Sequence, residues 1–287
     1  MTRLLLLLLW LLHWLPFPVL GALGKWVGLL LCLLMRERRR IVQVNLDLCF
    51  PQLPAAEKSA LARRHFIAIG RYMVEAGVWW WASAARIRRL VKIEHGERLE
   101  AYRGQPLIVF APHFIGLDAG GVRLSMDHEY VSMYARSKNR VLDEALRRGR
   151  VRFGRSKLVA RHEGVKNVLR LMKKERRFFY YLPDMDYGAK DAVFVPFFGV
   201  PAATITGMSR LSKLTGAPVI PAITRRSGNQ YVVSIGEVWE NFPTDDQLAD
   251  ARRMNAFLET EIMQSPEQYY WLHRRFKTRP PGEPRFY

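Results

Sequence analysis

The segment LIVFAPHFIGLD, residues 107–118, decides the fold prediction. It opens with a short apolar run, residues 107–111, that stops at Pro112 and gives way to a helical pattern. A short apolar run followed by a helix is typical of a buried strand in an α/β domain, and the loops after such strands often carry functional side chains. Pro112 ends the regular structure, so the loop can present His113, while Asp118 lies one turn into the helix. We therefore interpret His113 and Asp118 as a candidate pair at the end of a strand.

Apolar runs and helical patterns alternate along the rest of the chain and predict an α/β fold class. In residues 164–176, for example, Val165, Val168, Leu169 and Met172 follow the i, i+3, i+4, i+7 spacing of a helix that buries one face. We expect a central mixed sheet flanked by helices. The predicted strands are residues 107–111, 130–133, 178–182, 219–224 and 231–235, and the predicted helices are residues 55–82, 116–126, 141–148, 164–176, 204–214 and 247–263.

The N-terminus contains two apolar stretches, residues 4–15 and 19–35, followed directly by the basic run RERRR at residues 36–40. The basic run stands where a signal peptide would have its small-residue cleavage site, so we expect the segment to be retained. We predict a membrane-anchor helix with a basic juxtamembrane cluster in residues 1–40 and a catalytic domain in residues 41–287. Basic clusters beside apolar segments stay on the cytoplasmic side of a membrane, so the catalytic domain is expected to face the cytoplasm.

The 287-residue chain has a formal net charge of +19, which favours anionic partners. These are nucleic acid, an anionic membrane, or acidic small molecules and carrier proteins. The basic run beside the apolar stretch favours the membrane, and since no recognised nucleic-acid-binding motif is present we predict no nucleic-acid partner. The two cysteines, Cys32 and Cys49, indicate neither a disulfide framework nor a thiol metal site, and we assign no metal and no cofactor.

His113 and Asp118 are residue types that can activate an alcohol. An imidazole held by a carboxylate can take a proton from a hydroxyl at neutral pH, and the carboxylate stabilises the imidazolium that forms. The alternative is a hydrogen-bonded structural histidine next to an unrelated helix-capping aspartate.

Asp184 and Asp186 form an Asp-x-Asp motif directly after the predicted strand 178–182. This motif has two interpretations. It is typical of the divalent-metal site of a nucleotide-sugar glycosyltransferase, and it is also found where two carboxylates in a turn accept backbone hydrogen bonds.

Residues 113–118 resemble the H-x4-D/E motif of the lipid A late acyltransferases, the lauroyl or myristoyl acyltransferases of the lysophospholipid-acyltransferase-like superfamily. Residues 181–188, 193–204 and 269–280 are similar to later signatures of that family in the same order, so the resemblance covers nearly the whole chain. Asp118 departs from the many members that carry glutamate, which shortens the carboxylate arm by one methylene.

The resemblance implies a glycerolipid acyltransferase-like fold and a secondary acyl transfer in lipopolysaccharide biosynthesis at the inner membrane. The donor would be an acyl carrier protein thioester, and the acceptor would be the hydroxyl of an acyl chain on a lipid A precursor, a phosphorylated glycolipid. His113 would be the general base, Asp118 its orienting partner, and Arg150 a residue near the thioester or a substrate phosphate. Two enzymatic alternatives are acyl transfer to another glycolipid or lysophospholipid, and metal-dependent glycosyl transfer through Asp184 and Asp186. A further alternative is a nonenzymatic protein that binds nucleic acid or a membrane.

Further residues are expected to bind substrate. Arg148 belongs to the same basic run as Arg150, and a guanidinium can hold a phosphate through two parallel hydrogen bonds. Phe197 and Phe198 are expected to line an acyl-chain groove, with core packing as the alternative, and His273 is expected to contact a headgroup. Asp184 and Asp186 are expected to position the substrate.

Overall fold

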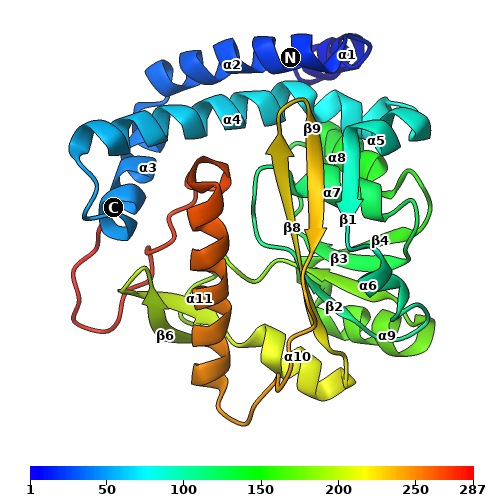
Figure 1. Ribbon diagram of the computed structural model, residues 1–287, viewed down its shortest axis with the longest axis vertical. Coiled ribbons are helices and arrows are strands. Elements are labelled where there is room, and N and C mark those ends of the chain that lie inside the picture. Colours follow the sequence, from blue (N-terminus) through cyan, green and yellow to red (C-terminus); the bar gives the residue numbers. More distant parts are fainter.

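A seven-stranded mixed sheet lies at the centre of the computed structural model, which describes residues 1–287 (Figure 1). The strand order is β1-β9-β8-β2-β5-β3-β4. Strands β8, β2, β5, β3 and β4 run parallel, β9 is antiparallel to β8, and β1 is parallel to β9. The bounds are β1 Val91–Glu94, β2 Ile108–Phe110, β3 Tyr130–Tyr134, β4 Ser156–Ala160, β5 Phe178–Tyr181, β8 Val219–Ser227 and β9 Gln230–Ile235. The predicted α/β fold with a mixed sheet is confirmed.

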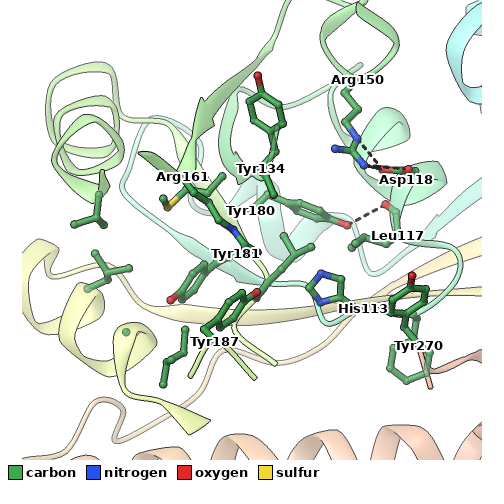
Figure 2. Close-up of a pocket in the computed structure, with 18 of the residues that line it drawn as sticks. His113, Leu117, Asp118, Tyr134, Arg150, Arg161, Tyr180, Tyr181, Tyr187 and Tyr270 are labelled. Carbon is green, nitrogen blue, oxygen red and sulfur yellow. Dashed lines mark hydrogen bonds and ion pairs between the residues drawn. The ribbon is translucent and has the colours of Figure 1, made fainter. Parts of the chain in front are cut away.

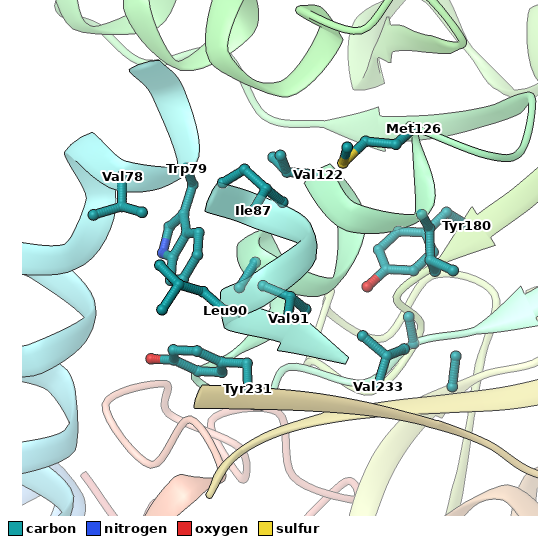
Figure 3. Packing of buried hydrophobic residues seen from close by; sticks show 14 of the residues in the cluster. Val78, Trp79, Ile87, Leu90, Val91, Val122, Met126, Tyr180, Tyr231 and Val233 are labelled. Carbon is teal, nitrogen blue, oxygen red and sulfur yellow. The ribbon is translucent and has the colours of Figure 1, made fainter. Parts of the chain in front are cut away.

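Helices cover both faces of the sheet, because side chains along each strand alternate between two apolar clusters. Val109 packs with α5, α7 and the end of α4, whereas Ile108 and Phe110 pack with α9, α10 and α11 on the other face. Figure 3 shows the first cluster, in which Trp79 of α4 meets Tyr231 of β9. The bounds are α4 Ala55–Trp81, α5 Ala84–Leu90, α6 Glu97–Glu100, α7 Leu117–Leu124, α8 Arg140–Val151, α9 Val165–Glu175, α10 Gly207–Thr215 and α11 Gln247–Gln264.

Three N-terminal helices precede α4: α1 Thr2–Leu12, α2 Phe17–Leu34 and α3 Arg36–Cys49. One helix, α2, is long and apolar enough to cross a membrane. It lies along α4 (Figure 1) in a contact made close by glycines. A Cβ atom on Gly28 would lie 2.3 Å from the carbonyl oxygen of Phe66, and one on Gly70 would lie 2.3 Å from that of Gly24. The predicted boundary at residue 40 falls inside α3, and the division into anchor and domain stays a prediction.

A separate hairpin, β6 Ala192–Phe197 and β7 Val200–Ile205, packs beside α11 and the C-terminal segment. The sequence analysis predicted neither of its strands. This part of the chain forms a third apolar cluster with α3 and the first half of α4. The hairpin and the C-terminal segment together support the loop that contains His113, as described below.

Candidate active site

A cavity of about 820 Å³ opens at the carboxyl ends of β2, β3 and β5, and α4 forms part of its wall. Eighteen of its 26 lining residues are aliphatic or aromatic, and six of these are tyrosines. His113, Asp118 and Arg150 all line it, so the structure brings together the three residues that the sequence singled out for catalysis. Helix α4 contributes Ile69 and Tyr72. Figure 2 shows the polar side chains of the cavity.

The loop after β2 is held from two sides. The Ala111 backbone N–H donates to the Tyr181 carbonyl at 2.9 Å, which continues the pairing of β2 with β5. Beyond Pro112, the C-terminal segment pairs with the loop: the Ile115 N–H donates to the Gln268 carbonyl at 2.8 Å, and the Tyr270 N–H donates to the His113 carbonyl at 3.0 Å. His113 therefore sits on a backbone fixed by hydrogen bonds on both sides.

The partner of His113 is Asp184. His113 Nδ1 lies 2.7 Å from Asp184 Oδ1, and the His113 backbone N–H donates to Asp184 Oδ2 at 3.0 Å. Burial alone would raise the pKa of the Asp184 carboxyl, but the charge of His113 and these hydrogen bonds outweigh burial and hold the pKa below its usual value. An ionised carboxylate can only accept, so Nδ1 carries a proton and Nε2 is the basic nitrogen. Nε2 has no hydrogen-bond partner within the protein.

Sheet order explains this pairing. Phe110 of β2 lies opposite Tyr181 of β5, and His113 and Asp184 each follow three residues later. The sequence analysis predicted Asp118 as the orienting partner and Asp184 as a substrate-binding residue. Both predictions need correction, because the Asp184 side chain has no exposed surface with which to touch a substrate.

Asp118 instead pairs with Arg150. Arg150 Nε donates to Asp118 Oδ1 at 2.9 Å, its Nη2 donates to Oδ2 at 3.3 Å, and the Tyr72 hydroxyl donates to Oδ2 at 2.8 Å. The charge of Asp118 is the main reason that the pKa of Tyr72 is raised and that the pKa of Arg150 is raised. Asp118 lies in the first turn of α7, from which its carboxylate faces α4 and α8 rather than His113. Figure 2 shows the contact between Arg150 and Asp118.

Arg148 does not line this cavity. Its side chain is 76% exposed and donates to Glu144 at 2.5 Å, on the opposite side of α8 from Arg150. Arg148 therefore does not touch a substrate held in the active-site cavity, and its role in substrate binding stays a prediction.

Asp186 and His273 form a buried structural contact. The carboxylate of Asp186 accepts from the backbone N–H and hydroxyl of Thr278, each at 2.8 Å, and from the Gly188 N–H at 2.9 Å. His273 Nε2 accepts the Asp186 backbone N–H at 3.0 Å. Burial lowers the pKa of His273 to about 4. Both side chains tie the C-terminal segment to the Asp184 loop, so the predicted substrate and headgroup contacts are replaced by structural ones.

Phe197 and Phe198 do not line the cavity either. Phe197 is fully buried against Phe198, Tyr269 and Phe276, and Phe198 also packs on Phe50. The alternative of core packing is therefore correct. The apolar wall of the cavity comes instead from α7, β3, α9, the end of β5 and α10, through residues that include Leu117, Met133, Leu169, Leu182, Leu211 and Leu214.

The sequence analysis also missed polar lining residues. Tyr72, Arg161, Tyr187, Lys190 and Arg210 all line the cavity, and the Arg161 guanidinium lies over the Tyr187 ring at 4.5 Å. Tyr187 and Lys190 follow the Asp-x-Asp motif closely, which was a usable signal, whereas Arg161 stands in no motif. No three His, Cys, Asp or Glu side chains come together as a candidate metal site, and the carboxylates of Asp184 and Asp186 have different partners.

Comparison with known proteins assigns the family. Residues 1–278 match the family described as bacterial lipid A biosynthesis acyltransferase. The chain is 36% identical over 285 residues to the lipid A biosynthesis lauroyltransferase of Escherichia coli (strain K12), covering 97% of this chain and 92% of that protein. It is 34% identical over 284 residues, with the same two coverages, to the lipid A biosynthesis palmitoleoyltransferase of that organism.

Among solved structures, a 1-acyl-sn-glycerophosphate acyltransferase from Thermotoga maritima is a distant match, with a TM-score of 0.37 and 12% identity over 84% of this chain and 97% of that chain. The match to the family profile and the identity to two curated relatives cover almost the whole sequence. This chain is therefore an acyltransferase and belongs to the bacterial lipid A biosynthesis acyltransferase family.

Proposed function

We propose that the protein transfers a fatty-acyl group from an acyl carrier protein thioester to the hydroxyl of an acyl chain on a phosphorylated lipid A precursor. The observation that carries the proposal is the His113–Asp184 pair, which opens into a largely apolar cavity of about 820 Å³ in a chain of this family. A cavity of this size and lining suits an acyl chain, and a histidine held by a carboxylate suits the activation of a hydroxyl.

In the proposed reaction, His113 Nε2 takes the proton from the acceptor hydroxyl while its oxygen attacks the thioester carbonyl. The tetrahedral intermediate collapses as the C–S bond breaks. The departing thiolate then takes a proton from the imidazolium, so that an ester and a free thiol are formed and His113 returns to its neutral form. Asp184 stabilises the imidazolium and holds the ring with Nε2 towards the cavity.

Arg150 is the proposed electrostatic residue. Asp118, which itself accepts a hydrogen bond from the Tyr72 hydroxyl, fixes this guanidinium at the cavity wall, where a fixed positive charge favours a developing oxyanion or a substrate phosphate. Asp118 then acts through Arg150 as a positioning residue. The leucines of the cavity wall are proposed to hold the acyl chain, in place of Phe197 and Phe198.

We further propose that α1 and α2 lie in the plane of the cytoplasmic face of the inner membrane. Large apolar side chains are exposed on both helices and in the turn between them: Leu4 on α1, Trp14 in the turn and Trp26 on α2 are each about 70% exposed. The first residues of α1 also touch the catalytic domain, because Asn139 Nδ2 donates to Thr2 Oγ1 at 2.6 Å. An α2 that crossed the bilayer would place Thr2 and Asn139 on opposite sides.

The membrane arrangement is tested with a single cysteine at residue 2 in a variant that lacks Cys32 and Cys49. In inside-out membrane vesicles, a membrane-impermeant maleimide should label this cysteine. Labelling only in right-side-out vesicles would mean that α2 spans the membrane.

The function is tested by mass spectrometry of lipid A from cells without the gene and from cells with the His113→Ala variant. Loss of one acyl mass in both strains would support secondary acylation and would identify the chain transferred. An unchanged lipid A, in a strain with no second enzyme of this kind, would point to another glycolipid or lysophospholipid acceptor. Turnover with purified acyl carrier protein thioesters tests the donor directly.

A further inference from the structure

A second hollow, of about 610 Å³, lies between α1, the end of α4 and α8. Four arginines line it, together with two tryptophans and one acidic residue: Arg3, Arg140, Arg148, Arg152, Trp80, Trp81 and Glu144. We name it the arginine hollow. The proposed reaction uses none of these residues.

Close packing of α8 separates the arginine hollow from the active site. A Cβ atom on Gly149 would lie 2.4 Å from the indole ring of Trp80, so α8 approaches α4 more closely there than any larger residue would allow. Arg148 and Arg150 flank Gly149 and point in different directions: Arg148 lines the hollow, and Arg150 lines the active-site cavity. The two sites therefore share one helix, about 10 Å across.

The charge of the hollow is strongly positive. Its one carboxylate, Glu144, already accepts hydrogen bonds from Arg147 and Arg148. Arg152 is used structurally, because it donates to the carbonyls of Trp79 and Ala82 at the end of α4. Arg3 and Arg140 have no ion pair or side-chain hydrogen bond within the protein, and both belong to the wall of the hollow. These two guanidiniums and Arg148 are the groups available to a ligand, and guanidinium groups recognise phosphate oxygens.

The surroundings of the hollow indicate that the ligand is a lipid. Helix α1, which supplies Arg3 and Leu6 to the hollow, exposes Leu4, Leu7 and Leu8 by half or more on its outer side. Trp81 is half-buried at the same rim, and tryptophan is favoured at the level of lipid headgroups. A phosphate bound by these arginines would sit beside a surface suited to acyl chains.

We propose that the arginine hollow binds the phosphate group of an anionic lipid. The phosphate has two possible sources: the phosphorylated glycolipid acceptor, which rests on the proposed function, or a bilayer phospholipid such as phosphatidylglycerol. In the first case the hollow holds the acceptor headgroup on one side of α8 while its hydroxyl reaches His113 on the other. In the second case it docks the enzyme on the membrane surface.

The test compares two full-length double variants that each lose two positive charges. Arg140→Gln with Arg148→Gln changes the hollow. Arg147→Gln with Lys173→Gln is the control, because Arg147 also pairs with Glu144 but lies outside the hollow, and Lys173 is exposed on α9. Thermal unfolding should be alike in both. Binding is measured by sedimentation with phosphatidylcholine vesicles with and without phosphatidylglycerol, and acceptor KM is measured with and without a phosphate on the acceptor.

A phosphate held by two guanidiniums predicts about a tenfold change in the affected affinity for the hollow variant alone. A rise in KM that vanishes for the acceptor lacking the phosphate identifies the acceptor as the source. A loss of the extra binding to phosphatidylglycerol vesicles identifies the bilayer. If the hollow variant equals the control in both assays, the proposal is wrong. The vesicle assay requires no turnover, so it decides the bilayer source even if the proposed acyl transfer fails.

Discussion

At the scale of single residues, the carboxylate of Asp184 is fully buried and both of its oxygens accept hydrogen bonds from His113. Asp184→Asn keeps the shape but removes the charge that stabilises the imidazolium. We expect kcat to fall by about 10²- to 10⁴-fold with little change in the acceptor KM. Steady-state kinetics checks this, with circular dichroism to confirm the fold. A variant that keeps the wild-type kcat would mean that Asp184 only supports the loop.

Asp118 and Arg150 provide a second test at this scale. If Asp118 acts through Arg150, then Asp118→Asn and Arg150→Ala remove the same interaction, and the double variant should lose no more than the worse single variant. We expect each to lower kcat/KM by about 10- to 10³-fold, in the range of a lost electrostatic contact. Additive losses would return Asp118 to the role of a separate partner for His113. Arg147→Ala is the matched control on the same helix and should retain activity.

The sequence singled out His113, Asp118 and Arg150, which line one cavity in the structure, but it could not assign their partners. Asp118 is close to His113 in the chain, so the pattern favoured it. The pairing of His113 with Asp184 follows from β2 lying next to β5, which are separated by two other strands in sequence. An apolar run reveals that a strand exists, whereas its neighbours depend on how all the strands pack together. The same limit applied to Arg161, which enters the cavity from a segment without a motif.

At the scale of elements, the long amphipathic helices and the buried parallel strands were predicted well because each is a continuous apolar or periodic run. The missed elements include short edge strands, the proline-containing hairpin strands β6 and β7, and α3, which begins with the basic run. Strand β4 lies at the sheet edge and its Lys157 is exposed, and each strand of the β6–β7 hairpin contains a proline, Pro196 or Pro201. Proline weakens a strand prediction, yet here the two prolines face each other in a two-stranded hairpin, where fewer backbone hydrogen bonds are needed.

The contact between α2 and α4 gives an element-scale prediction. A methyl group on Gly70 would lie 2.3 Å from backbone atoms of Gly24 and Gly28, and backbone cannot move aside as a side chain can. We expect Gly70→Ala to push the two helices apart and to lower the free energy of unfolding by about 1–3 kcal/mol or more. Gly21→Ala is the control and should destabilise the protein less. Its Cβ would meet only the guanidinium end of the Arg226 side chain, at 2.8 Å, and that end can move aside. Chemical unfolding and limited proteolysis after residue 34 measure the difference, and equal stability of the two variants would contradict the packing argument.

At the scale of the whole molecule, the N-terminal helices belong to the core as well as to the proposed membrane surface. Leu9, Phe17 and Leu20 are buried, and the Phe17 ring packs against Trp79 and Tyr231. Removing residues 1–34 deletes these side chains and exposes the apolar surface that they cover. The free energy of unfolding should fall by about 1.5–3 kcal/mol for each side chain. That total is comparable with the stability of a typical domain. We expect the truncated chain to aggregate or unfold, as measured by size-exclusion chromatography and tryptophan fluorescence, whereas a soluble, active truncation would show that the anchor is separable.

Two histidines, the fully buried His65 and the half-buried His273, predict how the stability of the whole protein depends on pH. Burial lowers the pKa of His65 to about 4, and it lowers the pKa of His273 to about 4. Both remain neutral in the folded protein, whereas in the unfolded chain they take up a proton near the usual value of 6.5. The unfolded state therefore binds more protons between these two pH values, and the free energy of unfolding falls as the pH decreases through this window. At pH near 5, each histidine should lower the free energy of unfolding by about 2 kcal/mol relative to neutral pH.

Other groups titrate in different windows or with the opposite sign. The pKa of Asp184 is lowered, so its contribution is lost only as the pH falls below the usual aspartate value of 3.8. Burial raises the pKa of Glu75, which takes up a proton early in the folded state and offsets part of the loss. Comparing variants isolates the histidines: His65→Gln can still donate to the Glu267 carbonyl, and His273→Gln can still accept the Asp186 N–H. The free energy of unfolding is measured with denaturant at pH about 7.5 and about 5. Between these two pH values, it should fall by about 2 kcal/mol less in each variant than in the wild type. A loss as large as that of wild type would mean that the histidine takes up its proton without unfolding.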